Sequence, residues 1–368
     1  MKSAWAIILS GYVWAGSAVA WQPATDCRAN IKVATCRVNP FVNDKEEDHD
    51  QRPCLGGEEK YVQQIENAYD LMPKKVQQVF CGLRRIYIEE SFYATGYASY
   101  ISELKTDSSG REVWQANGLV IGLNKARVFE NGWTLSEWYT RKEMTLFGLQ
   151  MTDPIPPGFP NFQVSIQFLT SRLGNPLLYS TLVHEVGHLV DMMLDIVKRD
   201  PTGCLNSQGS FKSGCKPDYS GIWTSLSWSP QGKVLPEYQT PHLEAPCYYN
   251  CTKQNRPLAS AKDFYFEIAD KGQFVSPYAA VNPREDFADT FHNFFLEDGR
   301  YRQNDLYYLM VSDPGQGESI SFRLRGKGLY KFEFLGYIAE TPWPNNMPAN
   351  YNWPAGAQLP EIPRRVID

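Results

Sequence analysis

The sequence has no excess of basic residues, no paired Cys-x-x-Cys motif and no long apolar run beyond its N-terminus. Lys and Arg number 36 against 41 Asp and Glu, a formal net charge of -5, so the basic footprint of a nucleic-acid-binding protein is missing. Without Cys-x-x-Cys, a zinc ribbon or a thioredoxin-like site has little support. No stretch after residue 20 approaches eighteen uninterrupted apolar residues, so we predict no transmembrane segment.

What is present is typical of a folded globular protein. Hydrophobic residues make up 43% and charged residues 21% of the chain, which allows a sizeable core. The length of 368 residues allows two or three domains, or one domain enlarged by insertions. We find no internal repeat. Plentiful Gly and Pro (27 and 25) and 14% aromatics indicate a loop-rich protein.

The first twenty residues have the pattern of a cleavable signal peptide. Lys2 supplies a short positive region, an apolar stretch follows over 4–16, and Ala18-Val19-Ala20 has the small-x-small pattern of a cleavage site. We therefore expect cleavage after Ala20 and a secreted or periplasmic protein.

Export favours disulfides for the cysteines, since an even number in an oxidising compartment is typical of disulfide bonding. Short loops suggest that Cys204 pairs with Cys215 and Cys247 with Cys251. The other four are then expected to pair among themselves: Cys27, Cys36, Cys54 and Cys81.

The order of predicted elements indicates an α+β fold. Helices are expected over 58–83 (interrupted at Pro73), 176–198 and 283–298, and strands over 85–89, 97–101 and 118–123. We divide the chain into the signal peptide (1–20), an irregular cysteine-containing N-terminal arm (21–58), a main domain (59–340) with a disulfide-rich insertion (199–276), and a Pro- and aromatic-rich extended tail (341–368).

The segment that carries chemistry is His184-Glu185-Val186-Gly187-His188, within an apolar helical stretch. Two histidines four apart on a helix differ by about 40° around the axis and by about 6 Å along it, so both imidazoles can reach one cation. The adjacent Glu185 is placed to activate a metal-bound water rather than to ligate the metal. Two merely structural histidines are the alternative, but histidine is scarce here, with five in all. The motif predicts one zinc ion per chain.

A catalytic zinc site needs a third protein ligand, and Glu285 is the preferred candidate. On a helix that begins after Asn282, Glu285 and Asp289 share one face, so Glu285 would bind zinc and Asp289 would accept the outer N–H of a zinc-bound histidine. The alternative is a capping box, in which Glu285 bonds back to the backbone of Asn282.

Other candidate ligands are retained in reserve. His242 and His292 could replace Glu285, and Asp191, three residues after His188, is expected to have an outer-shell or capping role. A metzincin site is excluded, because it requires Gly at position 191 and His at position 194, where the chain has Asp191 and Leu194.

These two segments resemble the gluzincin metallopeptidases, in which His-Glu-x-x-His is followed by Glu-x-x-x-Asp/Glu on a second helix. The phrase Glu285-Asp-Phe-Ala-Asp289 and a tyrosine seven residues earlier, Tyr278, are similar to the lethal-factor-like and Pro-Pro endopeptidase branch. The resemblance implies a zincin-type fold with an antiparallel or mixed sheet, an oxyanion-stabilising role for Tyr278, and alignment of substrate by the strand at 118–123. About a hundred residues separate the two motifs, roughly twice the spacing in the branch, and the insertion accounts for the excess.

We therefore expect an exported zinc metalloendopeptidase that acts on a peptide or protein substrate. Glu185 and Tyr278 would be catalytic, and His184, His188 and Glu285 would bind the metal. The alternatives are a catalytically inactive zincin-fold binding module and a cell-wall or glycan-binding protein whose exposed aromatics, such as Trp343 and Trp353, stack on sugars.

Overall fold

The computed structural model describes residues 22–39, 52–56, 58–92, 94–106, 110, 112–166, 174–197, 221–240, 258–297 and 307–344. The predicted signal peptide, the cysteine pairs at 204–215 and 247–251, and most of the predicted tail lie outside these residues. None of the helices in the described ranges is both long and apolar enough to cross a membrane.

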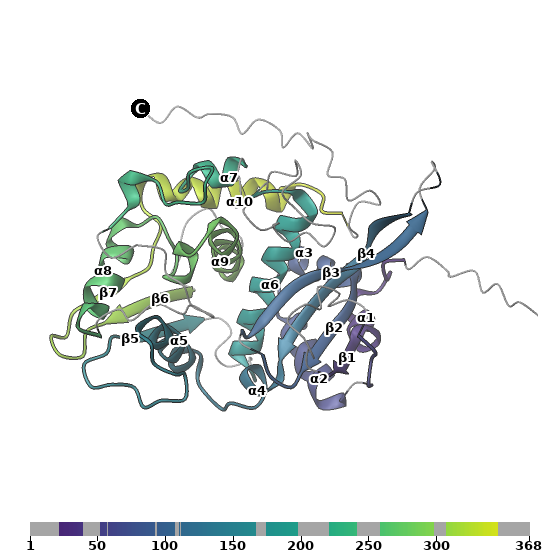
Figure 1. Cartoon of the computed structure of the whole chain (residues 1–368), viewed down its shortest axis with the longest axis horizontal. Helices are drawn as coiled ribbons and strands as arrows, with labels where there is room; N and C mark the ends of the chain where they lie inside the picture. The colour runs from purple at the N-terminus through teal and green to yellow at the C-terminus, as the bar shows by residue number, and fades with distance from the viewer. Residues whose placement is uncertain are drawn as a thin grey trace, which may run out of the picture.

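The fold is α+β, with two sheets on either side of a pair of helices (Figure 1). The larger sheet is mixed and has the order β1-β2-β4-β3. Strands β1 (Thr35–Val38), β2 (Leu83–Glu89) and β4 (Glu112–Asn124) are parallel, whereas β3 (Gly96–Thr106) runs antiparallel to β4. The smaller sheet is antiparallel, with β5 (Asn161–Ile166), β6 (Tyr307–Ser312) and β7 (Ser319–Ser321) in that order.

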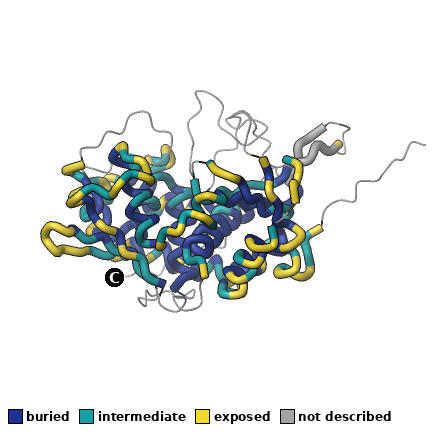
Figure 2. Tube along the Cα trace, turned by 90° about the horizontal axis from the view of Figure 1, so that it is seen from below, coloured by how far each residue is buried: buried dark blue, intermediate teal, exposed yellow. Residues whose placement is uncertain are grey.

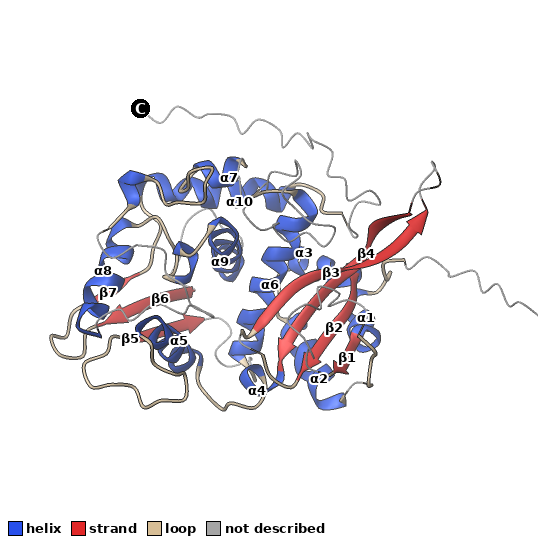
Figure 3. Ribbon diagram, in the orientation of Figure 1, coloured by secondary structure: helices blue, strands red, loops and turns tan. Residues whose placement is uncertain are grey.

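Helices cover these sheets, as the ribbon coloured by secondary structure shows (Figure 3). They are α1 (Cys27–Ala34), α2 (Glu59–Asp70), α3 (Lys74–Val79), α4 (Lys125–Val128), α5 (Leu135–Met144), α6 (Pro176–Leu194), α7 (Ile222–Ser225), α8 (Ala261–Lys271), α9 (Pro283–Leu296) and α10 (Tyr330–Glu340). The most deeply buried stretches of chain gather in the middle of the molecule, and exposed positions lie at its periphery (Figure 2).

The central helix α6 begins and ends with side-chain caps. The Asn175 side chain accepts a hydrogen bond from the backbone N–H of Leu178 at 3.0 Å, and Pro176 occupies the first helical position. At the other end, Asp195 adopts the left-handed conformation (φ 51°), and the Asp191 carboxylate accepts from the N–H of Val197 at 2.8 Å. Because nearly every residue of α6 is buried, the helix lies inside the core rather than on it.

Helices α6 and α9 pack directly against each other. A Cβ atom added to Gly187 would lie 3.0 Å from the Cα of Ala288 and 3.2 Å from the ring of Phe291. The missing side chain of Gly187 therefore lets the two helix backbones approach closely at this point.

Several sequence predictions are confirmed. The first predicted helix occurs as α2 and α3, interrupted at Pro73, and the three predicted strands lie within β2, β3 and β4. The four N-terminal cysteines do pair among themselves, as Cys27–Cys81 and Cys36–Cys54, and no free cysteine remains in the described residues.

Two expectations are wrong. The described residues of the range 21–58 are not irregular, because they include α1, capped by Asp26, and β1, which extends the sheet beside β2. The strand at 118–123 lies within β4, which pairs with β2 on one side and β3 on the other. Its backbone groups are thus occupied by the sheet, so it has no free edge that could align a substrate. Strand β3 lies at one edge of this sheet, and β1 lies at the other.

Candidate metal centre

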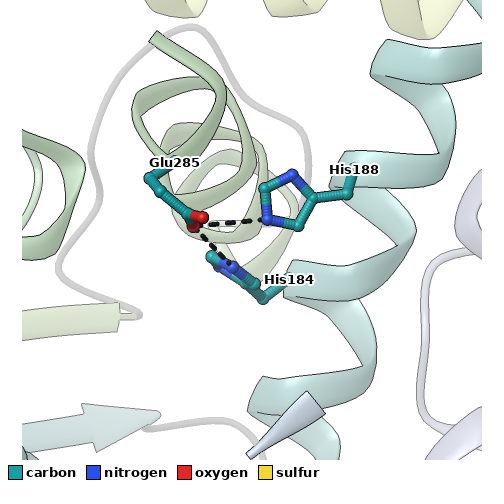
Figure 4. Close-up of side chains that lie close together, drawn as sticks. All are labelled: His184, His188 and Glu285. Atoms are coloured by element: carbon teal, nitrogen blue, oxygen red, sulfur yellow. Dashed lines mark ion pairs between the residues drawn. The ribbon is translucent and has the colours of Figure 1, made fainter. Parts of the chain in front are cut away.

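Three side chains from α6 and α9 converge on one point: His184, His188 and Glu285 (Figure 4). Their possible ligand atoms all lie within 4.8 Å of one another. One carboxylate oxygen of Glu285 lies 3.3 Å from Nε2 of His184 and 3.3 Å from Nε2 of His188. The three side chains are 12–19% exposed, so the cluster is largely withdrawn from solvent but reachable.

Local structure explains why these residues meet. The two histidines lie one turn apart on the same face of α6. The close contact between Gly187 and Ala288 brings that face against α9, and Glu285 lies three residues before Ala288 on the facing side. The Asn282 side chain accepts from the backbone N–H groups of residues 284 and 285 at 2.9 and 3.1 Å. This half of the predicted capping box forms, while the Glu285 carboxylate turns toward the histidines instead.

Asp289 lies directly behind His184. Its carboxylate oxygen is 2.7 Å from Nδ1 of His184, and its other oxygen accepts a hydrogen bond from the hydroxyl of Ser276. The backbone N–H of Ala279 donates to the same hydroxyl at 2.9 Å, which fixes the serine. Contact with Asp289 keeps a proton on Nδ1 and directs Nε2 of His184 toward the centre of the cluster. In the part of the chain that is described, the buried Nδ1 of His188 has no hydrogen-bond partner.

Within the cluster the pKa of His184 is raised and the pKa of Glu285 is lowered. Burial alone would lower the pKa of His184, but hydrogen bonds to Asp289 and Glu285 outweigh it and raise that pKa to about 10. Burial would raise the pKa of Glu285, yet the charge of His188 and hydrogen bonds from both histidines hold it well below its usual range. A protonated imidazole therefore faces an ionised carboxylate, and a bound cation can take the place of that proton.

Glu185 lies beside the cluster and is only 4% exposed. Burial raises the pKa of its carboxyl group, although the two neighbouring histidines partly offset the effect. One of its oxygens, Oε2, is buried with no hydrogen-bond partner in the described residues. The first residue of β3, Gly96, lies against the other oxygen: a Cβ atom at this position would be only 2.7 Å from Oε1. The carboxyl group thus lies between α6 and β3, with no room for a side chain at position 96.

A pocket opens on the side of His184 that faces the first turns of α6. Its lining combines the β2–β3 connection, α5, α6, α9 and the segment at Tyr278, and includes Ala94, Thr95, Gly96, Trp138, Tyr139, Lys142, Ser180, Thr181, His184, Glu185, Tyr278, Asp289 and His292. The ring of Tyr278 lies 6.1 Å from that of His184, between ring centroids. The ammonium of Lys142 lies 4.0 Å from the centroid of the Tyr278 ring, so it packs on the same aromatic ring.

Two of the reserve candidates, Asp191 and His292, do not join the cluster of His184, His188 and Glu285. Asp191 caps the end of α6 and forms an ion pair with Arg284 at 3.3 Å, which ties that end to the start of α9. His292 shares a hydrogen bond of 2.8 Å with the hydroxyl of Ser180, and burial lowers its pKa to about 3. His242 lies outside the described residues.

Sequence reasoning did not identify the pocket residues of α5. These residues, Trp138, Tyr139 and Lys142, lie on a helix that begins after Thr134. A threonine is a common N-cap residue, and in the structure its hydroxyl accepts a hydrogen bond from the N–H of Glu137 at 3.1 Å. That signal predicts a helix but gives no indication that it borders a site.

Comparison with protein families, curated proteins and solved structures finds no match for this chain.

Proposed function

We propose that the protein is an exported zinc metallopeptidase of the zincin type. The observation that carries the proposal is the arrangement of His184, His188 and Glu285. Zinc ligands about 2.05 Å from a tetrahedral metal lie about 3.3 Å apart, and the Glu285 oxygen lies 3.3 Å from both imidazole nitrogens. Two imidazoles and one carboxylate are a donor set used by catalytic zinc, which keeps a fourth position for water.

When bound there, zinc would lower the pKa of a water molecule and polarise a substrate carbonyl. Glu185 lies next to the cluster, and one of its carboxylate oxygens has no hydrogen-bond partner among the described residues, so it can take a proton from the attacking water and pass it to the leaving amine. Burial moves the pKa of Glu185 upward, which suits a group that acts first as base and then as acid. Asp289 orients His184 throughout.

The outer edge of β3 can bind an extended peptide. No strand in the described residues pairs with that edge, and its first residue, Gly96, adjoins Glu185. A peptide can add to the edge of a sheet as a further strand. A peptide added antiparallel to β3 would run toward Gly96, so that its C-terminal part would enter the pocket beside His184.

Tyr278 is proposed to donate a hydrogen bond to the oxyanion that forms during peptide hydrolysis. It lines the same pocket as His184 and Glu185 and is partly exposed there. An oxyanion donor must face the reacting carbonyl across the cleft. Tyr278 lies on a short helical turn just before α9, with its ring centroid 6.1 Å from that of His184, which supports this role.

The two alternative functions have less support. A non-catalytic metal or binding module would have no need for a buried Glu185 with a carboxylate oxygen that no group in the described ranges hydrogen-bonds. A glycan-binding surface would need exposed aromatic rings, but Trp343 is 8% exposed and packs on Phe291 and Phe295. Trp353 lies outside the described residues.

The proposed activity is tested by metal analysis of the purified full-length chain together with cleavage of a peptide library. We expect one zinc per chain and hydrolysis that a chelator abolishes and added zinc restores. A chain that binds no zinc, or that cleaves equally well after chelation, would contradict the proposal.

A further inference from the structure

A buried polar network lies on the face of the larger sheet opposite the metal cluster. The guanidinium of Arg52 donates to a carboxylate oxygen of Glu89 at 2.6 Å and lies 2.6 Å from the hydroxyl of Tyr97. The Tyr97 hydroxyl donates to the same oxygen of Glu89, also at 2.6 Å. The side chain of Glu89 is fully buried and that of Arg52 is 10% exposed. Hydrogen bonds to charged groups in such surroundings are among the stronger ones in proteins.

A disulfide holds Arg52 in this position. Arg52 belongs to the N-terminal segment 52–56, whose Cys54 is bonded to Cys36 on β1. The backbone of the segment also follows β1: the N–H of Leu55 donates to the carbonyl of Arg37 at 2.9 Å, and the N–H of Arg37 donates to the carbonyl of Gly56 at 2.8 Å. The segment is therefore attached to the sheet by the Arg52 side chain before Cys54 and by backbone hydrogen bonds after it.

The network joins the two stems of the connection that borders the candidate cleft. Glu89 is the last residue of β2 and Tyr97 the second residue of β3. The connection between them supplies Ala94 and Thr95 to the pocket, and Gly96 contacts Glu185. Successive side chains of a strand point to opposite faces, so Gly96 faces α6 while Tyr97 faces Arg52.

We propose that Arg52 is a positioning residue for the candidate cleft, held in place by the Cys36–Cys54 disulfide. The inference rests on the proposed peptidase function. By fixing Tyr97 and Glu89 together, Arg52 sets the position of the start of β3 against Glu185. A Cβ atom at Gly96 would lie only 2.7 Å from that carboxylate, so the strand and the base are close neighbours. A small shift of the strand therefore moves the edge on which a peptide would bind relative to the base. The N-terminal segment thus acts on the cleft through the sheet, from the opposite face.

The test compares Arg52→Met with Arg52→Lys, which retains the cation. Arg28→Met is the matched control: Arg28 makes a two-point ion pair with Asp70, at 2.9 and 3.1 Å, away from the strand stems. Zinc content, kcat and KM for a cleaved peptide, and hydrogen exchange of the backbone at 90–98 and 184–192 are measured for each full-length variant. Exchange reports on the strand position without requiring activity.

We expect Arg52→Met to lower kcat by about 10-fold or more, because misplacement of groups around a reaction centre by about 1 Å can cost about 100-fold. Zinc content should be unchanged, exchange should rise at 90–98 and not at 184–192, and Arg52→Lys should recover most of the activity. Arg28→Met should change none of these. If Arg52 had only a structural role, Arg52→Met would lower the melting temperature. Its kcat, measured well below that temperature, would then equal that of the wild type.

Serine replacement of Cys36 and Cys54 together should reproduce the effect of Arg52→Met, whereas replacement of Cys27 and Cys81 should lower stability without raising exchange at 90–98. Unchanged exchange and a kcat within twofold of wild type for Arg52→Met would overturn the inference. If the wild type itself shows no chelator-sensitive hydrolysis, the proposed function fails and this role for Arg52 fails with it. The exchange data would then still show whether Arg52 fixes the strand.

Discussion

Replacement of Glu285 by Ala separates the metal-ligand role of this residue from a capping role. The structure assigns the cap to Asn282, whose side chain accepts from two backbone N–H groups that an alanine at 285 would retain. The Glu285 carboxylate instead lies 3.3 Å from both imidazoles. Loss of that carboxylate therefore removes one of three proposed ligands and leaves the helix start intact.

The expected loss of zinc affinity is large. Removal of an outer-shell partner already weakens metal binding about 10–100-fold, so removal of a ligand should weaken it by more than about 100-fold. The loss of an acidic side chain from the first turn of α9 should change helix stability by only about 0.3–1 kcal/mol. Asn282→Ala is the matched control. It should cost about 0.5–2 kcal/mol of unfolding free energy and retain zinc.

The assay is competition for zinc between each purified variant and a chelator of known affinity, followed by metal analysis. Glu285→Ala should lose zinc at chelator concentrations that leave the wild type and Asn282→Ala loaded. If Glu285→Ala holds one zinc as tightly as the wild type, the ligand assignment is wrong. His242 would then have to be tested in its place.

Three further outcomes follow from the site. Glu185→Gln should retain zinc and reduce peptide hydrolysis by at least about 10²–10⁴-fold; loss of zinc, or full activity, would contradict the role of Glu185 as base. Tyr278→Phe should lower kcat by about 10²–10³-fold with little change in KM and zinc content, whereas near-normal turnover would leave Tyr278 a structural role. Because the pKa of buried His292 is lowered to about 3, its contribution to stability is complete above the ordinary histidine pKa of about 6.5 and is lost as the pH falls toward 3. Unfolding free energies at pH 7 and pH 5 should therefore differ less in His292→Asn than in the wild type, by up to about 2 kcal/mol, and equal differences would contradict this assignment.

The two helices of the site could be predicted because their signals are local. Asn175-Pro176 and Asn282-Pro283 are cap and first-turn pairs, and the structure begins α6 and α9 at those prolines. The spacing of His184 and His188 is likewise a property of a single helix. That Glu285 faces them depends on the contact of Gly187 with Ala288, about a hundred residues apart in the sequence, which no local pattern reveals.

The features that could not be predicted all depend on tertiary contacts. The four residues of β1 carry no periodic signal, and they form a strand because β2 pairs with them and Cys36 is tied to Cys54. The edge position of β3 depends on the order of the strands in the sheet, which no local sequence pattern reveals. The family resemblance assigned substrate alignment to the strand at 118–123, which lies in β4. The strand that adjoins Glu185 is β3. Lys142 reaches the pocket only because α5 packs near α6.

The most direct test of the central claim is anomalous diffraction at the zinc edge from crystals of the full-length chain grown with zinc. The account predicts one strong peak among Nε2 of His184, Nε2 of His188 and the carboxylate of Glu285. A peak at another group of side chains, or none at this cluster when zinc is supplied, would contradict it.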